Sequence, residues 1–137
     1  MVTKKFLTEL TFSIISVAIE VHKTLGPGLL ESVYHQCMEH EFMLRGINIV
    51  SECNVPVIYK EVHIATDLRC DFLVEDVMLV DIKAINTIPP IHFAKLLSYM
   101  KLLEKPKGII INFNCMNIFR EGQHTRVNEF YTNLPEE

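Results

Sequence analysis

The sequence lacks several features that would place it in a familiar class of protein. Its 4 cysteines form no CxxC pair, and its 6 histidines show no HExxH or other zinc spacing, so we expect no zinc site. No apolar run approaches the roughly 20 residues that a membrane-spanning helix needs. The net charge of −4 gives no overall positive field for nucleic acid. We therefore expect a cytoplasmic protein with free thiols.

The composition fits one domain with a substantial core. The 137 residues are expected to form a single domain over residues 1–137, and 49% of them are hydrophobic. This apolar excess suggests a surface that a second copy covers, which would make a homodimer. Charge is uneven, because residues 1–82 hold 6 Lys and Arg against 12 Asp and Glu, whereas residues 83–126 hold 7 against 2. Such a division suits a metal beside a polyanion, and equally an uneven solvated surface.

Apolar periodicity predicts an α/β fold. Steps of three and four predict helices over residues 6–25 and 29–44, and Pro89-Pro90 leads into another over 91–103. Strands are predicted over the residue ranges 47–50, 55–59, 62–66, 69–74, 77–84 and 109–111, with short strand segments in the tail. Helices flanking a mixed central β-sheet are therefore expected.

The triplet Asp81-Ile82-Lys83 is the first candidate for chemistry. Residues two apart on a strand project to one face, so Asp81 and Lys83 would lie together. A carboxylate beside an ammonium offers a metal ligand and a cation that orients water. A solvated strand face explains the triplet equally well.

Asp71 joins this pair only in one hairpin register. A two-residue turn would place Asp71 and Asp81 on opposite faces of the sheet. A three-residue loop, Glu75-Asp76-Val77, would pair Val74 with Met78 and bring Asp71 opposite Asp81, with Cβ atoms about 5 Å apart. We predict the three-residue loop, because its register also gathers a consistent apolar set on the other face.

Glu31 and Tyr34 form a third element near the start of the second predicted helix. An acid in the first helical turn is favourable for the helix dipole, and this local role alone could explain the presence of Glu31. Tyr34 lies on the same helical face, where it would be a core tyrosine or would hold Glu31 in place.

Taken in order, these segments resemble a known family. Gly28, Glu31 and Tyr34 match the pattern that names the GxxExxY protein family. The resemblance covers roughly residues 6 to 127 and continues through residues 69–74, 80–84, 91–101 and 107–114. The family is similar to a branch of the PD-(D/E)xK nuclease superfamily, which implies a restriction-endonuclease-like core.

The resemblance implies a Mg²⁺-dependent nuclease acting on nucleic acid, with DNA the expected substrate and Mn²⁺ a possible substitute. Asp71 and Asp81 would be metal ligands, Glu31 would join them directly or through water, and Lys83 would position the attacking water or stabilise charge at the phosphate. In two places the sequence departs from the family: Asp81 replaces the more usual Glu, and Lys95 replaces the usual Gln.

Lys95 and His92 are supporting candidates on the third predicted helix. Lys95 would bind phosphate, or would pair with an active-site acid and mark a drifted site. His92, one turn earlier, would reach a phosphate or water, although a polar residue at a helix start is a common feature. Two competing functions stay open: a non-catalytic nucleic-acid-binding module and a protein-interaction module.

Overall fold

The computed structural model describes residues 1–137. Its elements follow the order α1 (Lys4–Leu25), α2 (Glu31–Leu44), β1 (Ile49–Asn54), β2 (Val57–Tyr59), β3 (Val62–Ile64), β4 (Arg69–Val74), β5 (Met78–Lys83), α3 (Pro90–Leu103), β6 (Lys107–Asn112), a π-helical turn (Ile118–Gly122), β7 (Gln123–Val127) and α4 (Glu129–Thr132). None of the helices is both long and apolar enough to traverse a lipid bilayer.

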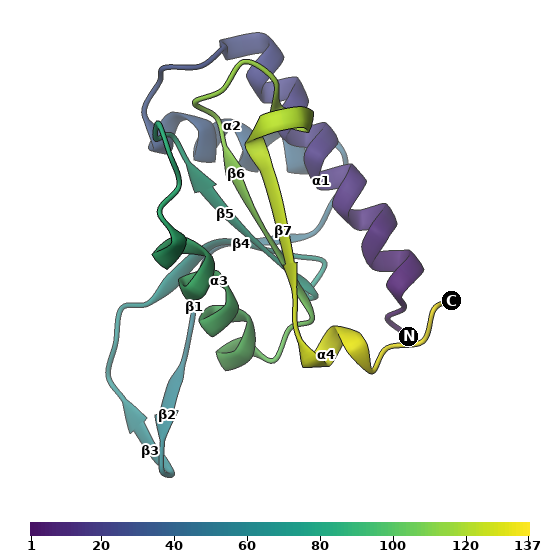
Figure 1. The fold of residues 1–137 in the computed structure, drawn as a ribbon, viewed down its shortest axis with the longest axis vertical. Coiled ribbons are helices and arrows are strands. Elements are labelled where there is room, and N and C mark those ends of the chain that lie inside the picture. The colour runs from purple at the N-terminus through teal and green to yellow at the C-terminus, as the bar shows by residue number, and fades with distance from the viewer.

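A five-stranded mixed sheet in the order β1-β4-β5-β6-β7 forms the centre of the fold. Strands β5 and β6 are parallel and joined through α3, whereas the other neighbours are antiparallel. Helices α1 and α2 cover one face, and α3 covers the other (Figure 1). The predicted α/β class, with helices flanking a mixed sheet, is confirmed.

Helix α1 supplies much of the larger core. Its buried residues, among them Leu7, Leu10, Ile14 and Val17, recur at the spacing that the sequence predicts. The Thr3 hydroxyl accepts a hydrogen bond from the Phe6 N–H at 3.0 Å and caps the first turn. The helix thereby presents one apolar stripe to the sheet.

The β4–β5 hairpin adopts the predicted register. Val74 pairs with Met78 and Phe72 with Val80, across a loop in which Glu75 and Asp76 both have positive φ. A three-residue hairpin loop needs a residue in the left-handed region, and Asp76 is one of the two that adopt it here. The apolar set of this hairpin is buried in one core cluster with α1 and α2, as predicted: Phe72, Val74, Met78, Val80 and Ile82.

Two segments differ from the prediction. The first strand does not end at Val50 but continues through the polar residues Ser51–Asn54, because β1 is an edge strand and needs only one buried face. In the tail, Ile118–Gly122 forms a π-helical turn before β7, and the Asn117 side chain caps its start. The short helix α4 after β7 was not predicted.

Strands β2 and β3 form a separate two-stranded arm (Figure 1). Tyr59 pairs with Val62 across Lys60-Glu61, the predicted connection, and both turn residues have positive φ. The arm extends beyond the end of the β1–β4 ladder, whose pair nearest to it is Asn54 with Arg69. Its side chains are largely exposed.

Candidate metal and catalytic site

Asp71 lies where the β4–β5 ladder ends. The last paired residues are Phe72 and Val80, so the same register places Asp71 opposite Asp81. There the Asp71 Oδ2 accepts a hydrogen bond from the Ile82 N–H at 2.7 Å. A side-chain carboxylate thus takes the role that a backbone carbonyl has elsewhere in the ladder. This bond fixes one oxygen of Asp71 beside β5.

The environment of Asp71 opposes its ionisation. Burial raises the pKa of Asp71 to about 6, and repulsion from the Asp81 carboxylate adds to the rise. The Ile82 N–H and the His35 ring act in the opposite direction, because both favour the carboxylate form. Two neighbouring acids with too little compensating charge are typical of a site that receives a cation.

Asp81 and Lys83 project together toward α3, as the strand alternation predicts. Leu79, two residues before Asp81, lies in the core cluster on this face of the sheet. The Lys83 Nζ lies 3.4 Å from the Asp81 Oδ2, and both side chains are largely buried. Burial raises the pKa of the neighbouring Tyr99, and the Asp81 carboxylate raises it further.

Glu31 and Tyr34 have separate tasks. Tyr34 is fully buried and stacks on Phe113 at 4.3 Å. Its hydroxyl donates to the Gly26 carbonyl at 2.6 Å and accepts from the Leu29 N–H at 3.1 Å. It is therefore a core tyrosine that holds the loop before α2, without a hydrogen bond to Glu31. Glu31, the first residue of α2, is exposed and lines a hollow that also contains Asp71.

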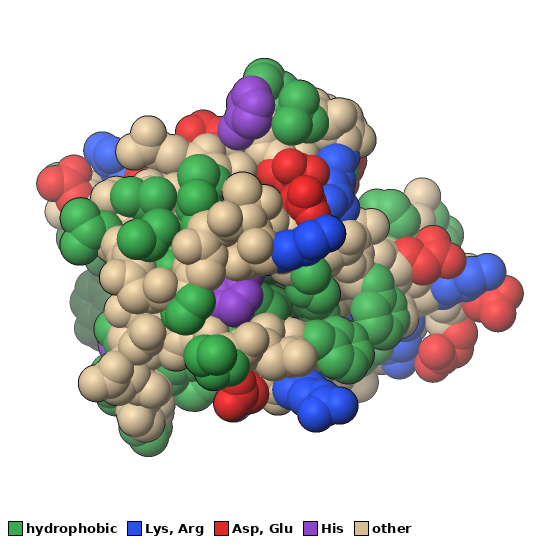
Figure 2. All heavy atoms as spheres, turned by 90° about the horizontal axis from the view of Figure 1, so that it is seen from above, with side chains coloured by type: hydrophobic (Ala, Val, Ile, Leu, Met, Phe, Trp, Pro, Cys, Tyr) green, Lys and Arg blue, Asp and Glu red, His purple; other side chains and the backbone are tan.

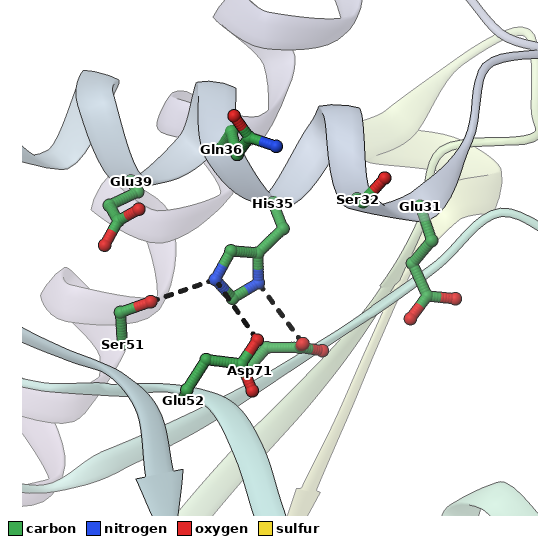
Figure 3. Close-up of a pocket in the computed structure, with 8 residues that line it drawn as sticks. All are labelled: Glu31, Ser32, His35, Gln36, Glu39, Ser51, Glu52 and Asp71. Atoms are coloured by element: carbon green, nitrogen blue, oxygen red, sulfur yellow. Dashed lines mark hydrogen bonds and ion pairs between the residues drawn. The ribbon is translucent and has the colours of Figure 1, made fainter.

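This hollow has a volume of about 530 Å³ and lies between α2, β1 and β4 (Figure 3). Its lining is entirely polar and contains four acids but no lysine or arginine: Glu31, Ser32, His35, Gln36, Glu39, Ser51, Glu52 and Asp71. Such a hollow repels a phosphate and attracts cations.

His35 is the centre of the polar contacts in the hollow. Its Nδ1 lies 3.2 Å from the Asp71 Oδ1, its Nε2 lies 2.9 Å from the Ser51 Oγ, and its ring stacks on Phe72 at 4.3 Å (Figure 3). The Glu52 Oε1 lies 3.8 Å from the same Nε2. One ligand atom each from His35, Glu52 and Asp71 lies within 4.8 Å of the others, a set that could hold a metal ion.

The sequence interpretation missed His35 and Glu52. His35 follows Glu31 by four residues on α2, so the helical spacing already places the two on one face. Glu52 gave no comparable signal, because its position depends on a positive φ of 52° in an edge strand. In the structure, Asp71 lies next to Asp81 of β5. It also lines the polar hollow that contains Glu31.

Lys95 and His92 lie on α3. Lys95 lines a small hollow with Asp81 and Tyr99, and its Nζ lies 5.3 Å from the centre of the Tyr99 ring. It forms no ion pair with an acid, so the arrangement expected of a drifted site is not formed. His92, in the first turn of α3, is half-buried and forms no side-chain hydrogen bond.

The face seen in Figure 2 carries no continuous basic surface. Lys and Arg side chains are separated there by apolar, acidic and uncharged groups. Lys107 from the basic segment is buried, and burial lowers its pKa. The uneven charge of the sequence therefore does not become a basic face on this side of the molecule.

Two acids and a lysine thus lie at the end of the β4–β5 hairpin, in a mixed sheet flanked by helices. The sequence model of the PD-(D/E)XK nuclease superfamily matches residues 8–127, and the chain belongs to this superfamily. No curated protein and no solved structure matches it significantly.

Proposed function

We propose that this protein is a metal-dependent nuclease that hydrolyses phosphodiester bonds, with DNA as its expected substrate. The observation that carries the proposal is the hairpin register, which sets Asp71 beside the Asp81–Lys83 pair in a chain of the PD-(D/E)XK superfamily. We also propose that it belongs to the GxxExxY branch, on the pattern of Gly28, Glu31 and Tyr34.

The residues present fit a divalent cation. Asp71 and Asp81 would hold it, and Glu31 would contribute directly or through water. Carboxylates suit Mg²⁺, which keeps several waters, and Mn²⁺ accepts the same ligands. His35 and Glu52 add donors on the other side of Asp71. When bound, the metal would supply a more acidic water and neutralise charge at the phosphate.

Lys83 would act on the reacting phosphate from the α3 side. In the structure the Lys83 ammonium lies 3.4 Å from the Asp81 carboxylate, so it would lie close to a cation that this carboxylate holds. From there it would orient the attacking water or stabilise charge at the phosphate. The exposed Lys95 would contact a phosphate from the same side.

The acidic hollow favours binding of a cation before binding of nucleic acid. Its four acids have no lysine or arginine among them, so the metal-free protein repels a nucleic-acid backbone at this point. Cation binding removes that repulsion. We therefore expect nucleic-acid affinity at this site to depend on divalent metal.

Calorimetry with Mg²⁺ and Mn²⁺ tests the proposal on the wild type, Asp71→Ala/Asp81→Ala and Asp67→Ala, an exposed carboxylate as matched control. We expect saturable binding that only the double variant loses. Cleavage of single- and double-stranded DNA and RNA is then measured with metal. Asp81→Ala should abolish cleavage, because it removes a proposed metal ligand.

Two results would reject this function. Wild type that binds neither metal, with or without DNA, would exclude the carboxylate site. Metal binding with no cleavage of any substrate would instead indicate a nuclease-fold module that binds nucleic acid or a protein partner.

A further inference from the structure

Two of the cysteines lie directly opposite each other on neighbouring strands. Cys53 of β1 and Cys70 of β4 are paired in the antiparallel register. Cys70 is buried in the core cluster beneath α3, and the half-buried Cys53 packs against the same cluster. Because both residues contact this cluster, their side chains share one face of the sheet.

This placement is compatible with a disulfide. Opposed residues of an antiparallel pair have Cα atoms about 4.5–5.5 Å apart, within the roughly 4.4–6.8 Å that disulfides span. Their Cβ atoms, about 4.5–5.5 Å apart in such pairs, need to approach by about 1 Å. Glu52, which directly precedes Cys53, has a left-handed backbone conformation and already interrupts the regular β1–β4 ladder. A small shift of Cys53 toward Cys70 therefore does not have to disrupt a regular ladder.

The other cysteines are separated from this pair by the sheet. Cys37 of α2 and Cys115, before the π-helical turn, pack against the core cluster on the α1 and α2 side. Neither can reach Cys53 or Cys70 in the folded protein. The chain therefore holds one matched thiol pair and two isolated thiols.

We propose that Cys53 and Cys70 are a reversible modification site that closes an intramolecular disulfide on reaction with a small disulfide such as glutathione disulfide. The more accessible Cys53 sulfur attacks one glutathione sulfur, forming a mixed disulfide and releasing one glutathione thiol. The Cys70 sulfur then attacks the Cys53 sulfur and displaces the second glutathione. Two protein thiols are oxidised, one glutathione disulfide is reduced, and the two thiol protons end on the two glutathione molecules.

The cross-link has a defined structural consequence. It closes a ring over residues 53–70, which contains the whole β2–β3 arm. It also joins the strands next to Glu52 and Asp71 in the polar hollow. Closing this ring restricts the unfolded chain, so the oxidised protein should melt at a higher temperature.

The test uses the full chain carrying Cys37→Ser and Cys115→Ser, with a matched control that also carries Cys53→Ser. After glutathione disulfide treatment, the first protein should lose two hydrogen atoms in mass and stay monomeric by non-reducing electrophoresis. Peptide mapping should join the Cys53 and Cys70 peptides, and the melting temperature should rise by roughly 10 °C. Dithiothreitol should reverse these changes, and the control should show none of them.

A stable glutathione adduct on Cys53, a link between chains, or an unchanged or lower melting temperature would overturn the proposal. The test uses neither metal nor nucleic acid. Its failure would leave the proposed nuclease function untouched, and loss of that function would leave this site untouched.

Discussion

Replacing Asp71 by asparagine is expected to stabilise the folded protein at neutral and alkaline pH. The folded-state pKa of Asp71, about 6, lies above its ordinary value of 3.8, so folding favours the protonated carboxyl group. The stability that this group contributes is complete below the lower pKa and is lost as the pH rises through the higher one. Asparagine does not ionise and still offers an oxygen to the Ile82 N–H.

The magnitude follows from the two pKa values. Their difference corresponds to roughly 3 kcal/mol lost by the wild type once Asp71 is ionised. Asparagine avoids this loss, but His35 then loses its carboxylate partner at 3.2 Å. We therefore expect Asp71→Asn to raise the free energy of unfolding by about 1–3 kcal/mol at about pH 8 and by much less at about pH 4.

Urea denaturation with a metal chelator, at both pH values, measures this effect. The control is Asp67→Asn, which removes an exposed carboxylate with no ion pair and should change the free energy of unfolding by less than about 0.5 kcal/mol. If Asp71→Asn is destabilising at the higher pH, or equally stabilising at both, the reasoning about this carboxylate is refuted.

Further expectations concern the pair, the loop and the packing around the site. Lys83→Met should lower the free energy of unfolding by about 1–3 kcal/mol in urea, because it leaves Asp81 buried without its partner, and adding Asp81→Asn should restore most of that loss. Tyr34→Phe should cost about 1–2 kcal/mol in the same assay, since the Gly26–Leu29 loop loses both hydrogen bonds of the hydroxyl group; a smaller loss would mean that the ring alone holds the loop. Gly108→Ala should cost about 1–3 kcal/mol, because its Cβ would lie 2.8 Å from the Leu96 Cδ1, and a neutral result would show that Leu96 can move aside.

Local patterns in the sequence predicted the parts of the site that belong to one hairpin. The α/β class and the β4–β5 register are confirmed because each depends on a period that neighbouring residues carry. Had the Glu75–Val77 loop been one residue shorter or longer, Asp71 and Asp81 would have been expected on opposite faces of the sheet. The metal and catalytic roles of Asp71, Asp81, Glu31 and Lys83 stay predictions.

The parts that the sequence did not predict depend on packing between distant segments. His35 meets Asp71 only because α2 crosses β4, and the two residues are 36 positions apart. Glu52 adopts a backbone conformation that its residue type rarely takes, so no propensity points to it. Strand β1 was misjudged for a related reason: its polar residues pair at an edge, where hydrophobicity is a weak guide.

The β2–β3 arm makes the chain modular at one place. Strands β1 and β4 pair directly at Asn54 and Arg69, so the arm is an insertion at the end of a hairpin that is complete without it. Its length and side chains can change with little effect on the sheet, since only its base, at Val55 and Leu68, reaches the core. Evolution, or a designer, can therefore exchange the arm to alter what the protein contacts while the carboxylates and Lys83 keep their places.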